Sequence, residues 1–293
     1  MTYFSKCLTL AGCLLLATTS ASGAEASSPG NYAQFLMAAS IKAHPSVRAE
    51  TIVVDTGPGH RKVMVTAHAA HPMSAAQLRA KGLSSSRQDA VTTHKTAHGW
   101  VVSLPLDDVA GRPVGRVHIA FKANVRVTSA ARTQAGRIAK ALSSRVLKPG
   151  NLLEPFPYVE HAPPTNTVAQ ALVERMLKQH PDILIIGLHA NVPGTNKNVI
   201  LASNIGRIGK AADDDDMRVI RTGKANLEVN KDGTRFEVEL PLLDRAGATV
   251  GAVGIVFRYK PGDDKQGMVK KATAIRDEMR QATASAAALF ART

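Results

Sequence analysis

The stretch VSLPLDDVAGRPVGRVHIAF, residues Val102–Phe121, decides the fold, because the chain repeats it at Val238–Phe257 as VELPLLDRAGATVGAVGIVF. Aligned without a gap, the two stretches agree at 12 of 20 positions, with an offset of 136 residues. The same offset superposes His44-Pro45 on His180-Pro181. A register held over about ninety residues indicates a duplicated domain, and this repeat is far longer than the ~20–50 residues of solenoid repeats.

Each copy predicts the same order of elements: a helix, two strands, a polar insert, three hairpin-linked strands and a helix. In the second copy, residues 167–180 have helical apolar spacing and Pro181 ends that helix. Strands joined by short turns pair antiparallel, and helices and insert can cover the sheet. The sequence therefore predicts an α+β fold, with a five-stranded antiparallel sheet and flanking helices in each copy. The expected helices are 31–43, 127–146, 167–180 and 264–290, the strands are 47–54, 61–67, 91–97, 99–105, 113–124, 182–190, 198–203, 225–230, 235–242 and 248–259, and the inserts are 68–90 and 204–224.

The repeated stretch is predicted to be the last hairpin of each sheet. Gly111 and Gly247 fit a turn residue at positive φ, where glycine carries no steric cost. Gly115 and Gly251 fit a strand position that a neighbouring backbone approaches closely.

The N-terminus has the layout of a secretory signal peptide over residues 1–26. Lys6 precedes an apolar run over 7–17, and an A-x-A site ends at Ala26. The run is too short to span a bilayer, and both cysteines lie before Ala26. We expect a periplasmic or secreted protein without disulfides and without a transmembrane helix in the mature chain. A lipoprotein anchored at Cys13, within the sequence LAGC, is an alternative.

The expected domains are 27–146 and 167–293, joined by a linker at 147–166 that contains five prolines. Residues 27–150 hold 17 Lys and Arg against 5 Asp and Glu, whereas 151–293 hold 19 against 17. The basic first domain is expected to attract anionic ligands, an anionic envelope surface or a membrane receptor, or to serve solubility alone. Nucleic acid is not an expected partner, because the basic residues lack interleaved aromatic residues.

The order of two strands, a helical insert and three strands resembles PAS-like domains. With a preceding helix and an export signal, the chain is similar to the extracytoplasmic Cache domains. The resemblance rests on ASNIGRIGKAADDDD at 202–216 and on the hairpin LPLLDRAGATVGAVGIVF. It implies a small-molecule pocket between the sheet and the insert. Typical members also carry a membrane anchor and a signalling module, which this sequence does not contain, so a free-standing binding or sensing module is expected.

The second copy contains the candidate ligand-binding residues. Asn204, Arg207 and Lys210 lie among glycines and could present donors and positive charge to a carboxylate or phosphate. Arg235 and Arg258 would suit the same anion if they lie on the pocket face. His189, on an apolar strand, is either a ligand contact or a core histidine with its own partners. The alternative for the Asn204–Lys210 segment is an exposed, capped turn.

The sequence favours neither metal binding nor catalysis. Asp213–Asp216 could bind Ca²⁺, but without the EF-hand spacing a solvated loop or a helix start is favoured. His68 with His71, and His94 with His98, match no fixed zinc or copper pattern. No nucleophile elbow, phosphate loop or dinucleotide fingerprint is present.

We therefore expect an exported, non-enzymatic protein that binds or senses a small molecule, with an anionic metabolite as the favoured ligand, and without a cofactor. A basic cell-envelope interaction protein is the alternative from another class. A metal-dependent hydrolase built from scattered His and Asp residues is a third.

Overall fold

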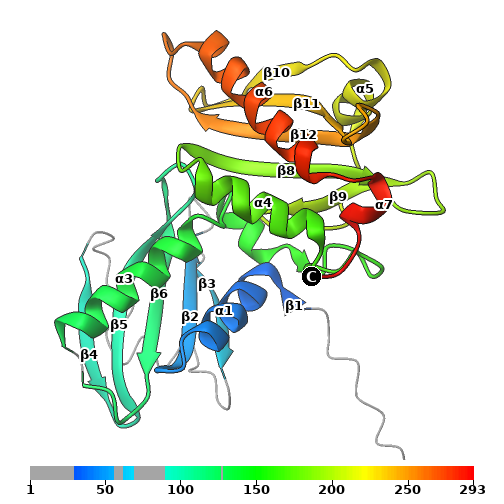
Figure 1. Ribbon diagram of the computed structural model, residues 1–293. Helices are drawn as coiled ribbons and strands as arrows, with labels where there is room; N and C mark the ends of the chain where they lie inside the picture. The colour runs from blue at the N-terminus through cyan, green and yellow to red at the C-terminus, as the bar shows by residue number, and fades with distance from the viewer. Residues whose placement is uncertain (1–29, 56–61, 69–89, 127) are drawn as a thin grey trace, which may run out of the picture.

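The computed structural model describes residues 30–55, 62–68, 90–126 and 128–293 (Figure 1). The predicted signal peptide at 1–26, the lipidation alternative at Cys13 and most of the first insert lie outside these residues. In the part of the chain that the structure describes, no helix is long and apolar enough to cross a bilayer.

The chain folds around two five-stranded antiparallel sheets (Figure 1). We call residues 30–146 the first half and residues 167–293 the second half. The first sheet has the strand order β3-β2-β6-β5-β4 and the second has β9-β8-β12-β11-β10, which is the same order with respect to the chain. The strands are β2 (Val47–Asp55), β3 (Lys62–His68), β4 (Thr92–Thr96), β5 (Gly99–Asp107) and β6 (Pro113–Phe121) in the first half, and β8 (Ile183–Asn191), β9 (Asn198–Ser203), β10 (Asn226–Val229), β11 (Arg235–Leu243) and β12 (Thr249–Arg258) in the second.

The pairing of the central strands repeats residue for residue. Gly115 pairs with Val54 between β6 and β2, and Gly251 pairs with Ala190 between β12 and β8. All seven pairs of the first interface recur in the second at the offset of 136, and the register shifts at the same place. The hairpins β5–β6 and β11–β12 agree in the same way, including their irregularity near the turn.

The predictions for the shared glycines are confirmed. Gly111 and Gly247 have φ values of 79° and 91°, a region that favours glycine in tight turns. A Cβ atom on Gly115 would overlap the carbonyl oxygen of Val53, and one on Gly251 would overlap that of His189. The close approach therefore occurs at equivalent positions in both sheets.

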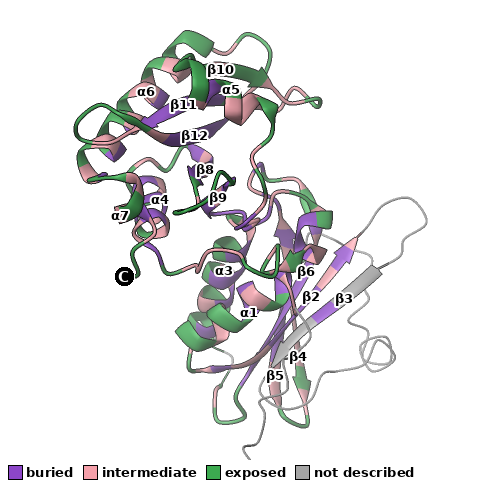
Figure 2. Ribbon diagram, turned by 90° about the vertical axis from the view of Figure 1, so that its right-hand side faces the viewer, coloured by how far each residue is buried: buried purple, intermediate pink, exposed green. Residues whose placement is uncertain are grey.

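Helices cover one face of each sheet, and the apolar cores lie between the helices and the sheets. Figure 2 shows this buried layer in both halves. His44 and His180 end the first helix of each half with nearly the same backbone angles, so the repeated His-Pro pair is a helix terminus. The covering helices are α1 (Tyr32–Ala43) and α3 (Ser129–Ser143) in the first half, and α4 (Val168–Gln179), α6 (Lys265–Ala282) and α7 (Ala286–Leu289) in the second.

The insert contains a helix, α5 (Asp214–Thr222), in agreement with the helical insert that the resemblance implied. Two features differ from the predicted elements. The helix expected over 264–290 is interrupted, because Thr283 has an extended backbone and Ser285 caps the short α7. The segment 147–166 contains the 3₁₀ helix η1 (Pro149–Leu153) and the strand β7 (Pro155–Phe156), which pairs with β1 (Gly30–Asn31). This segment therefore connects the two sheets and also packs between them.

Candidate functional site

A pocket of about 300 Å³ lies on the face of the second sheet opposite α4 and α6. We call this face the outer face and the cavity the outer-face pocket. Its walls come from β8, β11 and β12 and from the insert that follows β9. Its volume is at the lower end of the range for small-molecule sites, so it suits a small ligand.

One of two neighbouring glycines leaves open space at this pocket. Gly187 on β8 and Gly254 on β12 are direct neighbours in the ladder. A Cβ atom on Gly187 would meet no atom within 4 Å, so open space lies above this residue, whereas the Glu237 carboxylate lies above Gly254. At the equivalent places in the first sheet, Thr51 and His118 are paired and buried. The second sheet therefore has room for a ligand where the first has side chains.

The helix α5 brings carboxylates to one side of the pocket. Asp213 is its N-cap and accepts hydrogen bonds from the backbone N–H groups of Asp215 and Asp216, at 3.2 Å each. The Asp216 side chain accepts in return from the Asp213 N–H at 2.8 Å, which completes a capping box. Of the two structures expected for the aspartate run, a solvated loop or a helix start, the structure has the helix start. The helix packs against β11 and β12 and so delivers Asp216 to the outer face.

Further carboxyl groups and a histidine face Asp216 from the sheet. Glu239 is buried, and burial with the hydrogen bond and charge of Asp216 raises the pKa of its carboxyl. Desolvation by the surrounding protein raises the pKa of Glu237 to about 7, together with the negative charges of Glu228, Asp216 and Asp213. Solvent still reaches this residue. His189 Nε2 lies 3.4 Å from Asp216 Oδ1, while burial lowers the pKa of the ring.

Positive groups line another part of the pocket. The Arg235 guanidinium is half-buried, and among the described residues its Nη1 atom has no hydrogen-bond partner. Burial and then the charge of Arg112 lower its pKa. Lys210, from the insert, also lines the pocket. A buried guanidinium donor without a partner costs free energy, so this atom favours an acceptor that enters the pocket.

Four of the six predicted binding residues line the outer-face pocket: His189, Arg207, Lys210 and Arg235. Arg207, however, is paired with Glu154, and its Nε donates to Glu154 Oε2 at 2.9 Å. Its charge is already balanced, so Lys210 and Arg235 are the cations open to a ligand. The lining also includes carboxylates, which the expectation of an anion site omitted.

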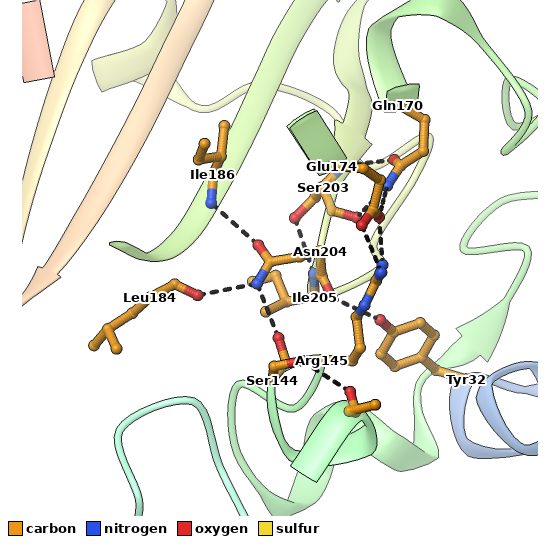
Figure 3. A network of polar contacts seen from close by, with 11 residues as sticks. Tyr32, Ser144, Arg145, Gln170, Glu174, Leu184, Ile186, Ser203, Asn204 and Ile205 are labelled. Atoms are coloured by element: carbon orange, nitrogen blue, oxygen red, sulfur yellow. Dashed lines mark hydrogen bonds and ion pairs between the residues drawn. The ribbon is translucent and has the colours of Figure 1, made fainter. Parts of the chain in front are cut away.

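Asn204 does not line the outer-face pocket but lies in a network of hydrogen bonds beside it in the chain fold (Figure 3). Its side chain is buried and accepts from the Ile186 N–H at 3.1 Å. The same amide donates to the carbonyl oxygens of Leu184 at 2.9 Å and Ser144 at 3.0 Å. Asn204 therefore joins the start of the insert to β8 and to the end of the first half, and its hydrogen bonds leave no role in ligand contact.

Arg258 also lies away from this pocket, at the contact between the two halves. Its Nη1 donates to the carbonyl oxygen of Ala110 in the turn of the first hairpin. Arg145 and Glu174 join the halves through two hydrogen bonds of 2.6 Å, and the Tyr32 hydroxyl donates to the Asn204 carbonyl at 3.1 Å (Figure 3). These contacts hold the two halves together, and none of their residues lines the outer-face pocket.

Sequence reasoning missed the glutamates of β11 and the glycine pair, although signals for both were present. The alternation that puts Phe236 and Val238 in the core puts Glu237 and Glu239 on the opposite face. Gly187 interrupts the β-branched run of β8. Only the pairing of β8 with β12 shows that Gly187 and Gly254 are neighbours.

Among the described residues, no group of three or more His, Cys, Asp or Glu side chains could hold a metal ion. His94 Nε2 lies 3.2 Å from Thr92 Oγ1, and His98 is exposed. The side chain of His68 and the whole of His71 lie outside the described residues.

The sequence matches no protein-family model and no curated protein. Solved structures with partial similarity include a putative GAF sensor protein from Burkholderia vietnamiensis, at 14% identity and a TM-score of 0.32, with 57% of this chain and 96% of that chain covered. The inducer-binding domain of the PobR transcription factor from Acinetobacter, in a double mutant bound to 3-hydroxybenzoic acid, has 10% identity, a TM-score of 0.28, and 39% and 96% coverage. The repressor BlcR of Agobacterium tumefaciens has 8% identity and a TM-score of 0.29, with 39% of this chain and 66% of the repressor, just under two thirds, covered. Scores this low assign neither a family nor a ligand to the chain.

Proposed function

We propose that this protein binds a small polar metabolite in the outer-face pocket of its second half. The observation that carries the proposal is the Arg235 Nη1 donor, which is buried in the pocket wall without a partner among the described residues. An acidic group of a ligand would supply its acceptor in a charge-assisted hydrogen bond. Lys210, on the same pocket, would add positive charge.

The ligand of this proposal also carries a donor or a positive group. Glu237 lines the pocket, is reachable from solvent and stands close to Asp216 and Glu228. With Asp213, four carboxyl groups line this small pocket, and they repel a ligand that is only anionic. An ammonium or similar group beside Glu237 would relieve this repulsion, while the acidic group meets Arg235. A zwitterionic ligand fits the charges better than the simple anion expected from the sequence.

We further propose that the two halves are duplicated PAS-like or Cache-like domains and that the protein acts outside the cytoplasm without catalysis. The identical strand order and the shared register of the central strands support the duplication. Support for export comes from the sequence of residues 1–26. The open space above Gly187, where the described part of the first sheet has Thr51, makes the second half the ligand-binding copy in this proposal.

The proposal is tested with Gly187→Val. The new side chain would enter the open space above β8, and a β-branched residue is compatible with a strand. The readout is the thermal midpoint with a panel of amino acids as probe zwitterions, beside their amides, which lack the carboxylate, and their N-acetyl forms, which lack the ammonium. A ligand at a hundred times its Kd should stabilise the protein by about 2.7 kcal/mol, a rise of several degrees.

We expect a zwitterion to stabilise the wild-type protein, and both modified forms and the Gly187→Val variant to lose the effect. Gly136→Ala is the control, because this glycine on α3 lies in the first half and also has no atom near its Cβ position. If no probe stabilises the wild-type protein, or if Gly187→Val responds as strongly as Gly136→Ala, the pocket is not the site.

A further inference from the structure

The helix-covered face of the first half exposes an array of basic side chains. No acidic residue occurs in residues 31–49 or 109–153, which include α1, β6, α3 and their connections. Seven basic residues in these segments are exposed. One, Lys148, follows α3, and we call the other six the basic face: Lys42, Lys122, Arg126, Arg132, Arg137 and Lys140.

The charge of the basic face is not balanced by neighbours. Within the described parts of the chain, none of the six side chains forms an ion pair or a hydrogen bond. The nearest acid along the chain, Glu50, is buried beneath α1, where Ser40 Oγ donates to it at 2.6 Å. The corresponding surface of the second half differs, because Lys271 pairs with Asp182 at 2.5 Å and His180 with Glu278 at 3.0 Å.

The six residues form a two-dimensional array and not a line. They come from the end of α1, the β6–α3 connection and α3 itself, and hydrogen bonds hold these segments together. The Lys122 N–H donates to the Ser46 carbonyl at 3.0 Å, and Gln134 Nε2 on α3 donates to Ser46 Oγ at 3.0 Å. Along α3, the positions from Arg132 to Lys140 span about 12 Å at 1.5 Å per residue.

We propose that the basic face docks on the surface of an anionic lipid bilayer. A planar headgroup layer meets a two-dimensional array of cations, whereas a linear polyanion would be followed by a single row or a groove. In the described part of the chain, the exposed large hydrophobic side chains are Val91, Val159 and Leu227, and none lies on α1 or α3. The contact is therefore electrostatic adsorption without insertion. Salt screens this attraction, so that at 0.1 M it extends only about 10 Å from the surface.

The test is co-sedimentation of the full chain with vesicles of phosphatidylglycerol mixed with phosphatidylcholine, and with vesicles of phosphatidylcholine alone. The apolar run at 7–17 contributes to both, so the difference between the two vesicles reports the electrostatic part. Each basic residue near such a surface contributes about 1 kcal/mol. Reversing three charges, in Arg132→Glu, Arg137→Glu and Lys140→Glu together, should reduce the partition onto anionic vesicles by on the order of a hundredfold.

The matched control is Lys224→Glu, Lys260→Glu and Lys270→Glu, three exposed residues of the second half whose reversal changes the net charge equally. We expect this variant to bind anionic vesicles within a fewfold of the wild type. The double variant Arg132→Lys and Arg137→Lys, which keeps the charge, should retain binding. An equal loss of binding to anionic vesicles in both triple variants would show that only the net charge matters, and it would overturn the proposal. Equal binding to both vesicles, or binding only to a soluble polyanion such as dextran sulfate, would overturn it as well. The pocket of the second half takes no part in this experiment.

Discussion

The ladders of the two sheets share one register, but their outer faces carry different side chains. At one pair of neighbouring positions in the first sheet lie Thr51 and His118, and His118 Nδ1 lies 2.7 Å from Ser103 Oγ. In the second sheet, Gly187 and Gly254 take these positions, open space lies above Gly187, and the Glu237 carboxylate of β11 lies above Gly254.

The comparison shows which features the two sheets share for structural reasons and which belong to the pocket of the second sheet. The register, the turn glycines and the close approaches are the same in both halves, because they fix the backbone. The side chains on the outer face are free to differ, because they do not enter the core beneath the helices. The second sheet can therefore hold a pocket on this face where the first sheet carries the buried Thr51 and His118.

The largest expected effect tests the shared backbone. Gly251→Ala and Gly115→Ala should each destabilise the protein by more than about 3 kcal/mol, because a Cβ at either place overlaps a carbonyl oxygen of the neighbouring strand. Urea denaturation followed by circular dichroism measures this. The helical Gly136→Ala should instead stabilise by up to about 1 kcal/mol. Similar stability of all three variants would refute the equivalence of the two close approaches.

A smaller effect tests the connection between the halves. Asn204→Ala removes three hydrogen bonds and leaves the Ile186 N–H without its acceptor, so we expect a loss of about 2 to 4 kcal/mol. Arg145→Ala breaks an ion pair that is about one third exposed and should cost less than about 1 kcal/mol. Differential scanning calorimetry compares the two variants. A larger loss in Arg145→Ala would mean that the ion pair, and not the amide, holds the halves together.

The smallest effect concerns pH and separates the two outer faces. The pKa of Glu239 is raised in the folded protein, so the stability it contributes is present at low pH and is lost as pH rises. The pKa of His118 is lowered to about 4, mainly by burial, so its contribution is present above about pH 6.5 and is lost as pH falls toward 4.

Glu239→Gln should therefore reduce the loss of stability between about pH 6 and 9 by at least about 1 kcal/mol and leave the acid side unchanged. His118→Asn should do the reverse. Urea midpoints measured from pH 4 to 9 decide this, and an unchanged alkaline slope in Glu239→Gln would show that its carboxyl is not held protonated.

The chain order of the elements and most of their bounds followed from the sequence. The strand expected at 198–203 agrees with β9, and the helix at 167–180 differs from α4 by one residue at each end. The break at Thr283 was not visible, because the apolar spacing continues across it. The strand β7 was hidden in a proline-rich stretch, because its partner β1 lies more than a hundred residues away.

The candidate site was predicted in part. The polar insert pointed to Lys210 and Arg207, because donors between glycines are visible locally. The same reasoning selected Asn204, whose partners at 144, 184 and 186 only the tertiary structure brings together. Arg258 lies at the end of β12, and the position of the first half decides that it donates to Ala110.

The amino-acid sequence was enough to establish the repeat, the order of the strands along the chain and the glycines of the hairpins. The repeat is visible as identical residues at a constant offset of 136, and turn glycines are recognised from their immediate neighbours. The tertiary structure alone decided that Gly187 lies beside Gly254, that α5 brings Asp216 to the β11 glutamates, and that Arg207 is paired with Glu154. These facts depend on contacts between residues far apart in the chain, and the free energy that selects such contacts comes from packing of the whole fold.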